Sequence, residues 1–169
     1  FNVIFYVEFA QYQEEIRNQM PNIGLLINPY AKKFLVQPHL IRQLTDEFPE
    51  KKSVWQPATL SEVAKCAKAI LQTKIDYLFI LGGDGTFRAI VGELVRYRGK
   101  RSLPTFIPLQ GGTANLYSKQ LYGKRNPIHH IQVSLQKMNG EEHPKVNTIN
   151  ILKINEEYGF IFAIGGISN

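Results

Sequence analysis

The sequence predicts an α/β fold in which a parallel sheet carries helices on both faces. Four short apolar runs alternate with segments whose apolar residues recur at helical spacing. The run at residues 77–81 is apolar throughout, which is typical of a strand buried on both faces. Two of the four runs end in glycine clusters, Gly82-Gly83 and Gly111-Gly112. Because ligands of such sheets bind beyond the carboxyl ends of the strands, these clusters mark the expected site.

The positions of the individual strands and helices follow from the apolar runs and from the helical spacing of apolar residues. The expected strands are residues 23–27, 53–56, 77–81 and 105–109. A helix is expected to open at Pro38, another at the capping box Thr59-Leu60-Ser61-Glu62, and another at Asn126-Pro127. Helices are also expected after each glycine cluster, through 90–95 and over 116–121. We expect the adjacent His129 and His130 to lie on the surface of the last helix.

Length and charge limit the function classes. The chain has 169 residues and a net charge of +6, which suits one domain, or one domain with a piece of another, and an anionic partner. We expect that partner to be a nucleotide or an acidic membrane surface and not nucleic acid. The cations at 96–101 fit a solvated helix end better than a membrane-docking patch. A single cysteine, Cys66, excludes an internal disulfide and indicates a reducing compartment, so a cytoplasmic protein, peripheral at the membrane, is expected.

The two ends of the chain do not share the alternation of strands and helices that is expected in the middle. Residues 1–19 form an apolar extension that is either an addition before a natural start near Met20 or an added edge strand. Residues 20–140 are expected to form the α/β lobe. Residues 141–169 are expected to begin a β-rich second lobe, with strands at 146–154 and 158–164 joined as a hairpin around 155–157. Because a lone hairpin is marginal, we expect its apolar residues (Ile149, Ile151, Phe160, Phe162) to be partly uncovered and to promote self-association as a homodimer.

The first glycine cluster extends into Gly82-Gly83-Asp84-Gly85-Thr86. A glycine turn between a strand and a helix presents backbone N–H groups, and phosphate is their usual ligand. Asp84 is unusual there, since a carboxylate beside a phosphate needs a cation or a shared proton. Asp84 therefore suggests a water-held Mg²⁺ or the orientation of a hydroxyl for phosphoryl transfer. The alternative interpretation is that Asp84 or Thr86 only caps the following helix.

Three motifs in order resemble the catalytic domain of the diacylglycerol kinase and sphingosine kinase family. They are Asn28-Pro29, residues 82–86, and Gly112-Thr113-Ala114-Asn115, and the likeness extends from residue 23 to about 169. The resemblance implies a lobe like those of phosphofructokinase and NAD kinase, which binds ATP and Mg²⁺, followed by a β-sandwich lobe. It implies that the nucleotide site comprises Asn28, Thr59, Gly82, Gly83, Asp84, Gly85, Thr86, Gly112, Thr113 and Asn115, with Asp84 as the Mg²⁺-linked catalytic residue.

The resemblance predicts an ATP-dependent lipid kinase that acts on a diacylglycerol- or sphingoid-like hydroxyl. It places the catalytic base in the second lobe, beyond Asn169, so the chain alone is expected to be inactive. Two positions depart from the family pattern. Arg88-Ala89 stands where Asn-Glu is common, and Leu116 stands where many bacterial members have Asp. The alternatives are an NAD kinase, which shares the residue 82–86 motif, and a module that binds nucleotide without turnover.

Overall fold

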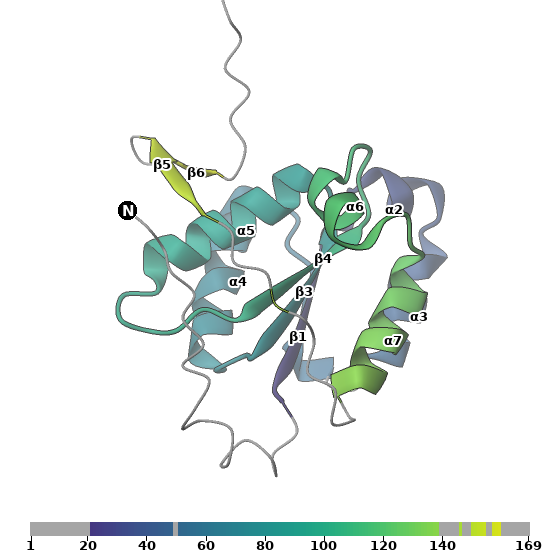
Figure 1. Cartoon of the computed structure of the whole chain (residues 1–169), viewed down its shortest axis with the longest axis horizontal. Coiled ribbons are helices and arrows are strands. Elements are labelled where there is room, and N and C mark those ends of the chain that lie inside the picture. The colour runs from purple at the N-terminus through teal and green to yellow at the C-terminus, as the bar shows by residue number, and fades with distance from the viewer. Residues whose placement is uncertain (1–20, 49–50, 139–145, 147–149, 155–156, 160–169) are drawn as a thin grey trace, which may run out of the picture.

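A computed structural model describes residues 21–48, 51–138, 146, 150–154 and 157–159 of the chain. Its centre is a four-stranded parallel sheet in the order β2-β1-β3-β4 (Figure 1). The strands are β1 (Ile23–Ile27), β2 (Val54–Trp55), β3 (Tyr77–Gly82) and β4 (Thr105–Gln110). The parallel sheet predicted from the sequence is therefore confirmed.

Helices cover both faces of this sheet, as predicted (Figure 1). One face carries α4 (Leu60–Gln72) and α5 (Asp84–Tyr97), and the other carries α3 (His39–Glu47) and α7 (Pro127–Met138). Two short helices, α2 (Lys32–Val36) and α6 (Leu116–Tyr122), follow the ends of β1 and β4. Within the described residues, no helix has the length and apolar character needed to cross a bilayer.

Strand β3 explains why the run at 77–81 is uniformly apolar. Leu78 and Ile80 face α4 and α5, whereas Phe79 and Leu81 face α3 and α7. All four side chains are at most 1% exposed. Complete burial of each such side chain contributes roughly 1.5–3 kcal/mol to folding, so β3 holds the two layers together.

The predicted helix starts at Thr59 and Asn126 are confirmed by their hydrogen bonds. The Thr59 hydroxyl accepts from Glu62 N–H at 3.2 Å, and Asn126 Oδ1 accepts from Ile128 N–H at 3.0 Å. The Glu62 carboxylate closes the first cap by accepting from the N–H of Ala58 at 2.7 Å, one residue before the Thr59 expected from a capping box. Both helices thus begin at the residues that the sequence indicates.

Two local features differ from the sequence analysis, one a wrong boundary and one a helix that was not predicted. Residues 51–53, partly expected as strand, form a 3-10 turn, so β2 has only two residues. Helix α2 was not predicted, because Phe34 is its single buried residue and its N-cap, Ala31, offers no side-chain cap.

Strands β2 and β4 are the outer strands of the four-stranded sheet. Strand β4 contains Pro108, a residue that sheets tolerate mainly in edge strands.

The predicted hairpin is antiparallel, with β5 (Leu152–Ile154) paired to β6 (Glu157–Gly159). It packs on α5, where Tyr158 lies beside Gly92, and Ile151 is only 7% exposed within the core under α4 and α5. The expectation that Ile151 would be partly uncovered is therefore wrong, because α5 supplies a covering surface. The expectations for residues 1–19, Ile149, Phe160 and Phe162 fall outside the described residues.

His130 also differs from its expected place on the surface. It is 7% exposed, and its ring lies edge-on to Tyr122 with the centroids 4.3 Å apart. Burial, reinforced by the positive charges of Arg125 and His129, lowers the pKa of His130 to about 4. His129 is exposed as expected.

This burial predicts a loss of stability in mild acid. Because the pKa of His130 is below the unfolded value of 6.5, the unfolded chain takes up the proton first as the pH falls. We expect the free energy of unfolding to drop by about 1–2 kcal/mol between pH 6.5 and 4, allowing for solvent screening around the ring. Urea unfolding at several pH values measures this drop. The variant His130→Phe should lose that component while His129→Gln keeps it, and identical pH profiles would contradict the assignment.

Candidate functional site

The two glycine turns touch each other at the carboxyl edge of the sheet. The carbonyl of Gly82 accepts hydrogen bonds from the N–H groups of Gly111 (2.9 Å) and Gly112 (3.1 Å). A Cβ atom placed on Gly112 would lie 2.4 Å from Gly83 Cα, so no side chain fits there. Among the described glycines only Gly99 and Gly123 have positive φ. The turns therefore need glycine for close approach, and not for the unusual backbone angles that glycine also permits.

Gly85 is different, because no described residue requires it to be glycine. A Cβ atom on Gly85 would meet no described atom within 4 Å. The residue lies in the first turn of the 14-residue helix α5, whose N-cap is Gly83 and makes no side-chain cap bond. Backbone N–H groups at such a helix start attract anions. Open space above Gly85 is therefore where a phosphate could approach this turn.

Asn28 ties the end of β1 to the first glycine turn. Its Nδ2 donates to Thr86 Oγ1 at 2.8 Å, and its Oδ1 accepts from Tyr30 N–H at 2.9 Å. The Thr86 side chain in turn fills the space beside Gly82, where a Cβ atom would lie 2.5 Å from Thr86 Oγ1. Asn28 thus fixes the position of Thr86, whose hydroxyl still has its own proton to donate.

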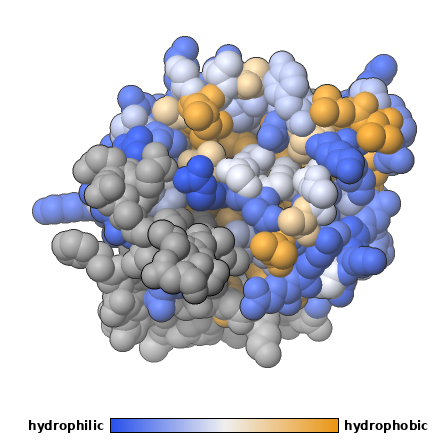
Figure 2. All heavy atoms as spheres, turned by 90° about the horizontal axis from the view of Figure 1, so that it is seen from above, coloured by the Kyte–Doolittle hydropathy of each residue, from blue (hydrophilic) through white to orange (hydrophobic). Residues whose placement is uncertain are grey.

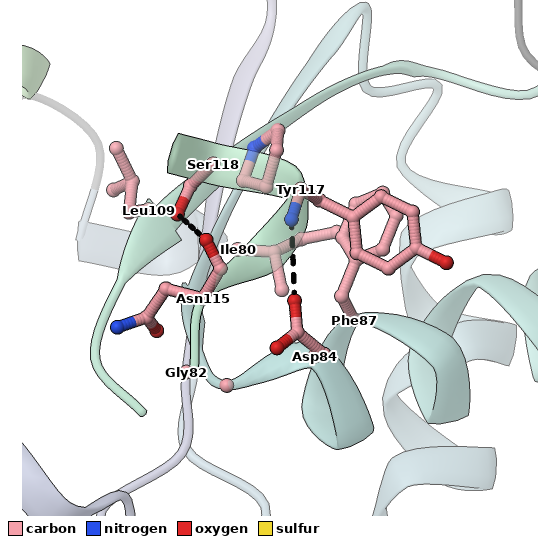
Figure 3. Close-up of a pocket in the computed structure, with 10 residues that line it drawn as sticks. Ile80, Gly82, Asp84, Phe87, Leu109, Asn115, Tyr117 and Ser118 are labelled. Carbon is pink, nitrogen blue, oxygen red and sulfur yellow. Dashed lines mark hydrogen bonds between the residues drawn. The ribbon is translucent and has the colours of Figure 1, made fainter. Parts of the chain in front are cut away.

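The Asp84 carboxylate reaches a neighbouring helix. Its Oδ1 accepts from the N–H of Tyr117, in the first turn of α6, at 3.3 Å (Figure 3). A negative charge at a helix start is favourable. Asp84 therefore does cap a helix, but the helix is α6 and not α5, in which Asp84 is the first residue.

Asn115 holds the second glycine turn in shape. Its Oδ1 accepts from Gly112 N–H at 2.8 Å, and its Nδ2 donates to Gly112 O at 2.7 Å. Its backbone is left-handed, with φ of 52°, and its side chain is 8% exposed. Its carbonyl accepts from the Ser118 hydroxyl at 3.3 Å (Figure 3). Nearby Thr113 is exposed above the turn.

Thr59 stands apart from the other predicted site residues. It follows β2, which is separated from β3 by β1 in the sheet, and its hydroxyl caps α4. Within the part of the chain that the structure describes, no hydrogen bond joins Thr59 to either glycine turn. The structure thus brings together Asn28, residues 82–86 and residues 112–115, and leaves Thr59 at the margin.

A small cavity of about 10 Å³ lies beneath the turns, enough for roughly one water molecule (Figure 3). Phe87 and Tyr117 form one wall, with their ring centroids 5.1 Å apart. Burial, and next the Asp84 charge, raise the pKa of Tyr117. The sequence analysis missed Tyr117, which no motif marks. Since the cavity is so small, a nucleotide would lie across the open side of the turns.

The described residues contain no cluster of three or more His, Cys, Asp or Glu side chains able to enclose a metal ion. Among the described carboxylates, Asp84 is the one that the hydrogen bonds reported above place at the glycine turns. One carboxylate is enough for Mg²⁺ only when substrate phosphates and water complete its coordination. A metal bound here would therefore arrive with a phosphate ligand.

Comparison with known proteins gives a consistent result. Residues 22–151 match the model of the diacylglycerol kinase catalytic domain, which is more than half of the chain. Proteins of Staphylococcus aureus strains JH9 and Newman, named as presumed lipid kinases, are each 36% identical over 89 residues. That segment is 53% of this chain and 26% of each relative, so the likeness covers only about a quarter of their length.

Two solved structures from Bacillus anthracis strain Sterne have a similar fold. Both carry the name diacylglycerol kinase, one as a presumed assignment. Each superposes with a TM-score of 0.61 at 21% identity over 84% of this chain. The superposed region is 49% and 46% of those two chains, so this chain corresponds to less than half of each. At this identity the likeness concerns the fold.

Proposed function

Because the chain belongs to the diacylglycerol kinase catalytic domain family, we propose that it forms the nucleotide-binding part of an ATP-dependent lipid kinase. The reaction would transfer the γ-phosphoryl group of ATP to a hydroxyl of a diacylglycerol- or sphingoid-like lipid. The observation that carries the proposal is the pair of glycine turns in backbone contact at the carboxyl edge, with open space above Gly85.

The residues present fit the phosphates of ATP. The first turn of α5 supplies backbone N–H groups and the positive end of a 14-residue helix. The Gly82–Gly111 and Gly82–Gly112 hydrogen bonds hold the second turn against the first, so the two turns are already in contact before a ligand arrives. Thr86 adds a hydroxyl whose position Asn28 fixes. Catalysis of phosphoryl transfer is mainly positioning and charge neutralisation, which such a preformed site favours.

Asp84 fits a role beside Mg²⁺. Bound Mg²⁺ would neutralise charge on the phosphates. The Tyr117 N–H fixes the orientation of the Asp84 carboxylate through Oδ1, and a carboxylate held in this way can bind a water molecule of the metal shell or orient the lipid hydroxyl. The requirement for a lipid acceptor also means that the carboxyl edge must come close to a membrane.

A second candidate function is nucleotide binding without turnover. It is favoured by Leu116, which is 54% exposed at the start of α6, where many bacterial relatives would have a carboxylate by the resemblance above. With Leu116 present, Asp84 lacks an acidic neighbour at this point. Measurement of ATP binding and of lipid phosphorylation on the same preparation separates the two candidates.

We expect ATP with Mg²⁺ to bind at the glycine turns. Titration of the isotope-labelled chain should shift the amide resonances of residues 82–86 and 111–115, because these residues form the two turns that a phosphate would approach. The basic end of α5, at residues 96–101, serves as an internal control for simple attraction of anions. Shifts confined to 96–101 would contradict the proposed site.

A further inference from the structure

A second cavity lies at the end of α5 that is opposite the glycine turns. Its volume is about 230 Å³, whereas the cavity beneath the turns holds about 10 Å³. The described residues that line it come from α4, from α5 and from the segment after α5: Lys68, Leu71, Gln72, Tyr97 and Arg101. Tyr97 is the last residue of α5 and Asp84 the first, so the two are about 20 Å apart at about 1.5 Å per residue. The cavity is therefore separate from the proposed nucleotide site.

The ends of two neighbouring helices form this cavity. Helices α4 and α5 run side by side on one face of the sheet (Figure 1). Lys68, Leu71 and Gln72 are three and four residues apart near the end of α4, so they share one face of that helix. Leu71 is only 7% exposed, which gives the cavity an apolar floor.

Gly99 brings Arg101 to the same cavity. Its φ of 58° lies in the left-handed region, which glycine adopts readily. The N–H of Arg101 donates to Arg98 O at 2.9 Å and closes the turn. The chain thus turns back directly after α5, and Arg101 completes the lining.

The side chains of Lys68 and Tyr97 already touch. The Nζ atom of Lys68 lies over the Tyr97 ring, 4.5 Å from its centroid. Such a cation–π contact stabilises one position of the long lysine side chain. The ammonium group is therefore held at the wall of the cavity before any ligand binds.

The charge around the cavity has one sign. Residues 63–75 and 94–101 contain no Asp or Glu, and they supply three and four cations respectively. Of these cations, Arg96 is paired with Glu93 at 2.7 Å. Cations near helix ends are ordinary. Here, however, two of them line a cavity that also has an aromatic wall and an apolar floor, and this combination suits an organic anion.

The exposed apolar side chains lie elsewhere in the domain. Among the described residues, none of the exposed large apolar side chains belongs to residues 68–72 or 96–101. By contrast, the face seen from above the molecule of Figure 1 shows several apolar patches set among hydrophilic side chains (Figure 2). Lys68, Gln72 and Arg101 are exposed at the cavity, which therefore receives its ligand from water.

We propose that this cavity binds a small, water-soluble phosphate ester. The Arg101 guanidinium can donate two parallel hydrogen bonds to a phosphate group, and the Lys68 ammonium adds a second positive charge. The Gln72 amide can donate to an ester or hydroxyl oxygen. Leu71 and the Tyr97 ring contact the organic part. The proposal goes beyond the proposed function, since none of these residues belongs to the glycine turns.

Titration of the full isotope-labelled chain with phenyl phosphate tests this cavity, because that probe combines a phosphate group with a ring. Inorganic phosphate is the comparison that lacks the organic part. The variant K68Q/R101Q removes both lining cations. The variant K65Q/K100Q is the charge-matched control, because it removes two cations that belong to the same segments but do not line the cavity. All four side chains are exposed, so the fold should tolerate both changes.

We expect phenyl phosphate to cause saturable amide shifts at residues 68–72 and 97–101 and to bind about 5-fold or more tightly than inorganic phosphate. K68Q/R101Q should weaken this binding by about 10-fold or more, whereas K65Q/K100Q should stay within about twofold of the unmodified chain. Shifts confined to residues 82–86 and 111–115, equal affinity for the two probes, or equal weakening by the two variants would each overturn the proposal. Titration of K68Q/R101Q with ATP tests the nucleotide site separately, and the shifts at 82–86 should persist.

Discussion

Replacing Asp84 with asparagine is expected to lower lipid phosphorylation on the order of 10²–10⁴-fold in a complete kinase that carries this domain. Asparagine keeps an oxygen that can accept the Tyr117 N–H, so α6 retains its cap. It lacks the negative charge that a Mg²⁺-linked or hydroxyl-orienting group needs. The substitution therefore separates the chemical role of Asp84 from its structural role.

Steady-state lipid phosphorylation and thermal unfolding should be measured on the same preparations. Asp46→Asn is a suitable control, since Asp46 is an exposed carboxylate whose ion pair among the described residues is with Arg42, four positions earlier, at 3.6 Å. We expect that control to keep full activity. Near-normal turnover in Asp84→Asn would assign Asp84 to capping of α6 alone.

The two turns should respond in opposite ways to a single added methyl group. In Gly112→Ala the new Cβ atom would lie 2.4 Å from Gly83 Cα and 3.1 Å from Gly83 N. Both are backbone atoms that cannot rotate away, so the turns must separate, and we expect a loss of about 1–3 kcal/mol or more in stability. The same separation of the turns would lengthen or break the hydrogen bond from Gly112 N–H to Gly82 O.

Gly85→Ala is the matched partner of this variant. Its Cβ atom meets no described atom within 4 Å, and alanine suits a helix better than glycine, so stability should be unchanged or rise by up to about 1 kcal/mol. Nucleotide affinity should nevertheless fall, because the methyl group occupies the space that a phosphate would enter. Thermal unfolding with an ATP titration of both variants gives the comparison. Unchanged affinity in a stable Gly85→Ala protein would place the phosphates elsewhere.

Much of the fold could be predicted because it depends on local patterns. Continuous apolar runs predict buried strands, and Thr59 and Asn126 cap helices with side chains close in sequence. The order of strands and turns then places residues 82–86 and 112–115 at one edge. What each glycine does there could not be predicted, because the separation of Gly83 from Gly112 depends on the packed sheet.

The details that escaped prediction are contacts between distant segments. Asp84 and Tyr117 are 33 residues apart, and no spacing rule relates them. His130 is buried because Tyr122, on another helix, lies against it. Helix α2 has almost no buried face of its own, and its start is fixed by the bond from Lys33 N–H to Gly111 O. Such elements follow from tertiary structure, and local propensity does not mark them.

The outer strands of the sheet also affect how the domain behaves in a crowded solution. A long, regular outer strand offers unpaired N–H and C=O groups on which a second chain can form a new strand, and this is a common route to aggregation. Strand β2 offers only two residues, and β4 is interrupted by Pro108, which has no N–H to donate. Within the described residues, neither side of the sheet is a good template for a further strand. A domain built in this way can be kept at high concentration without its sheets joining edge to edge.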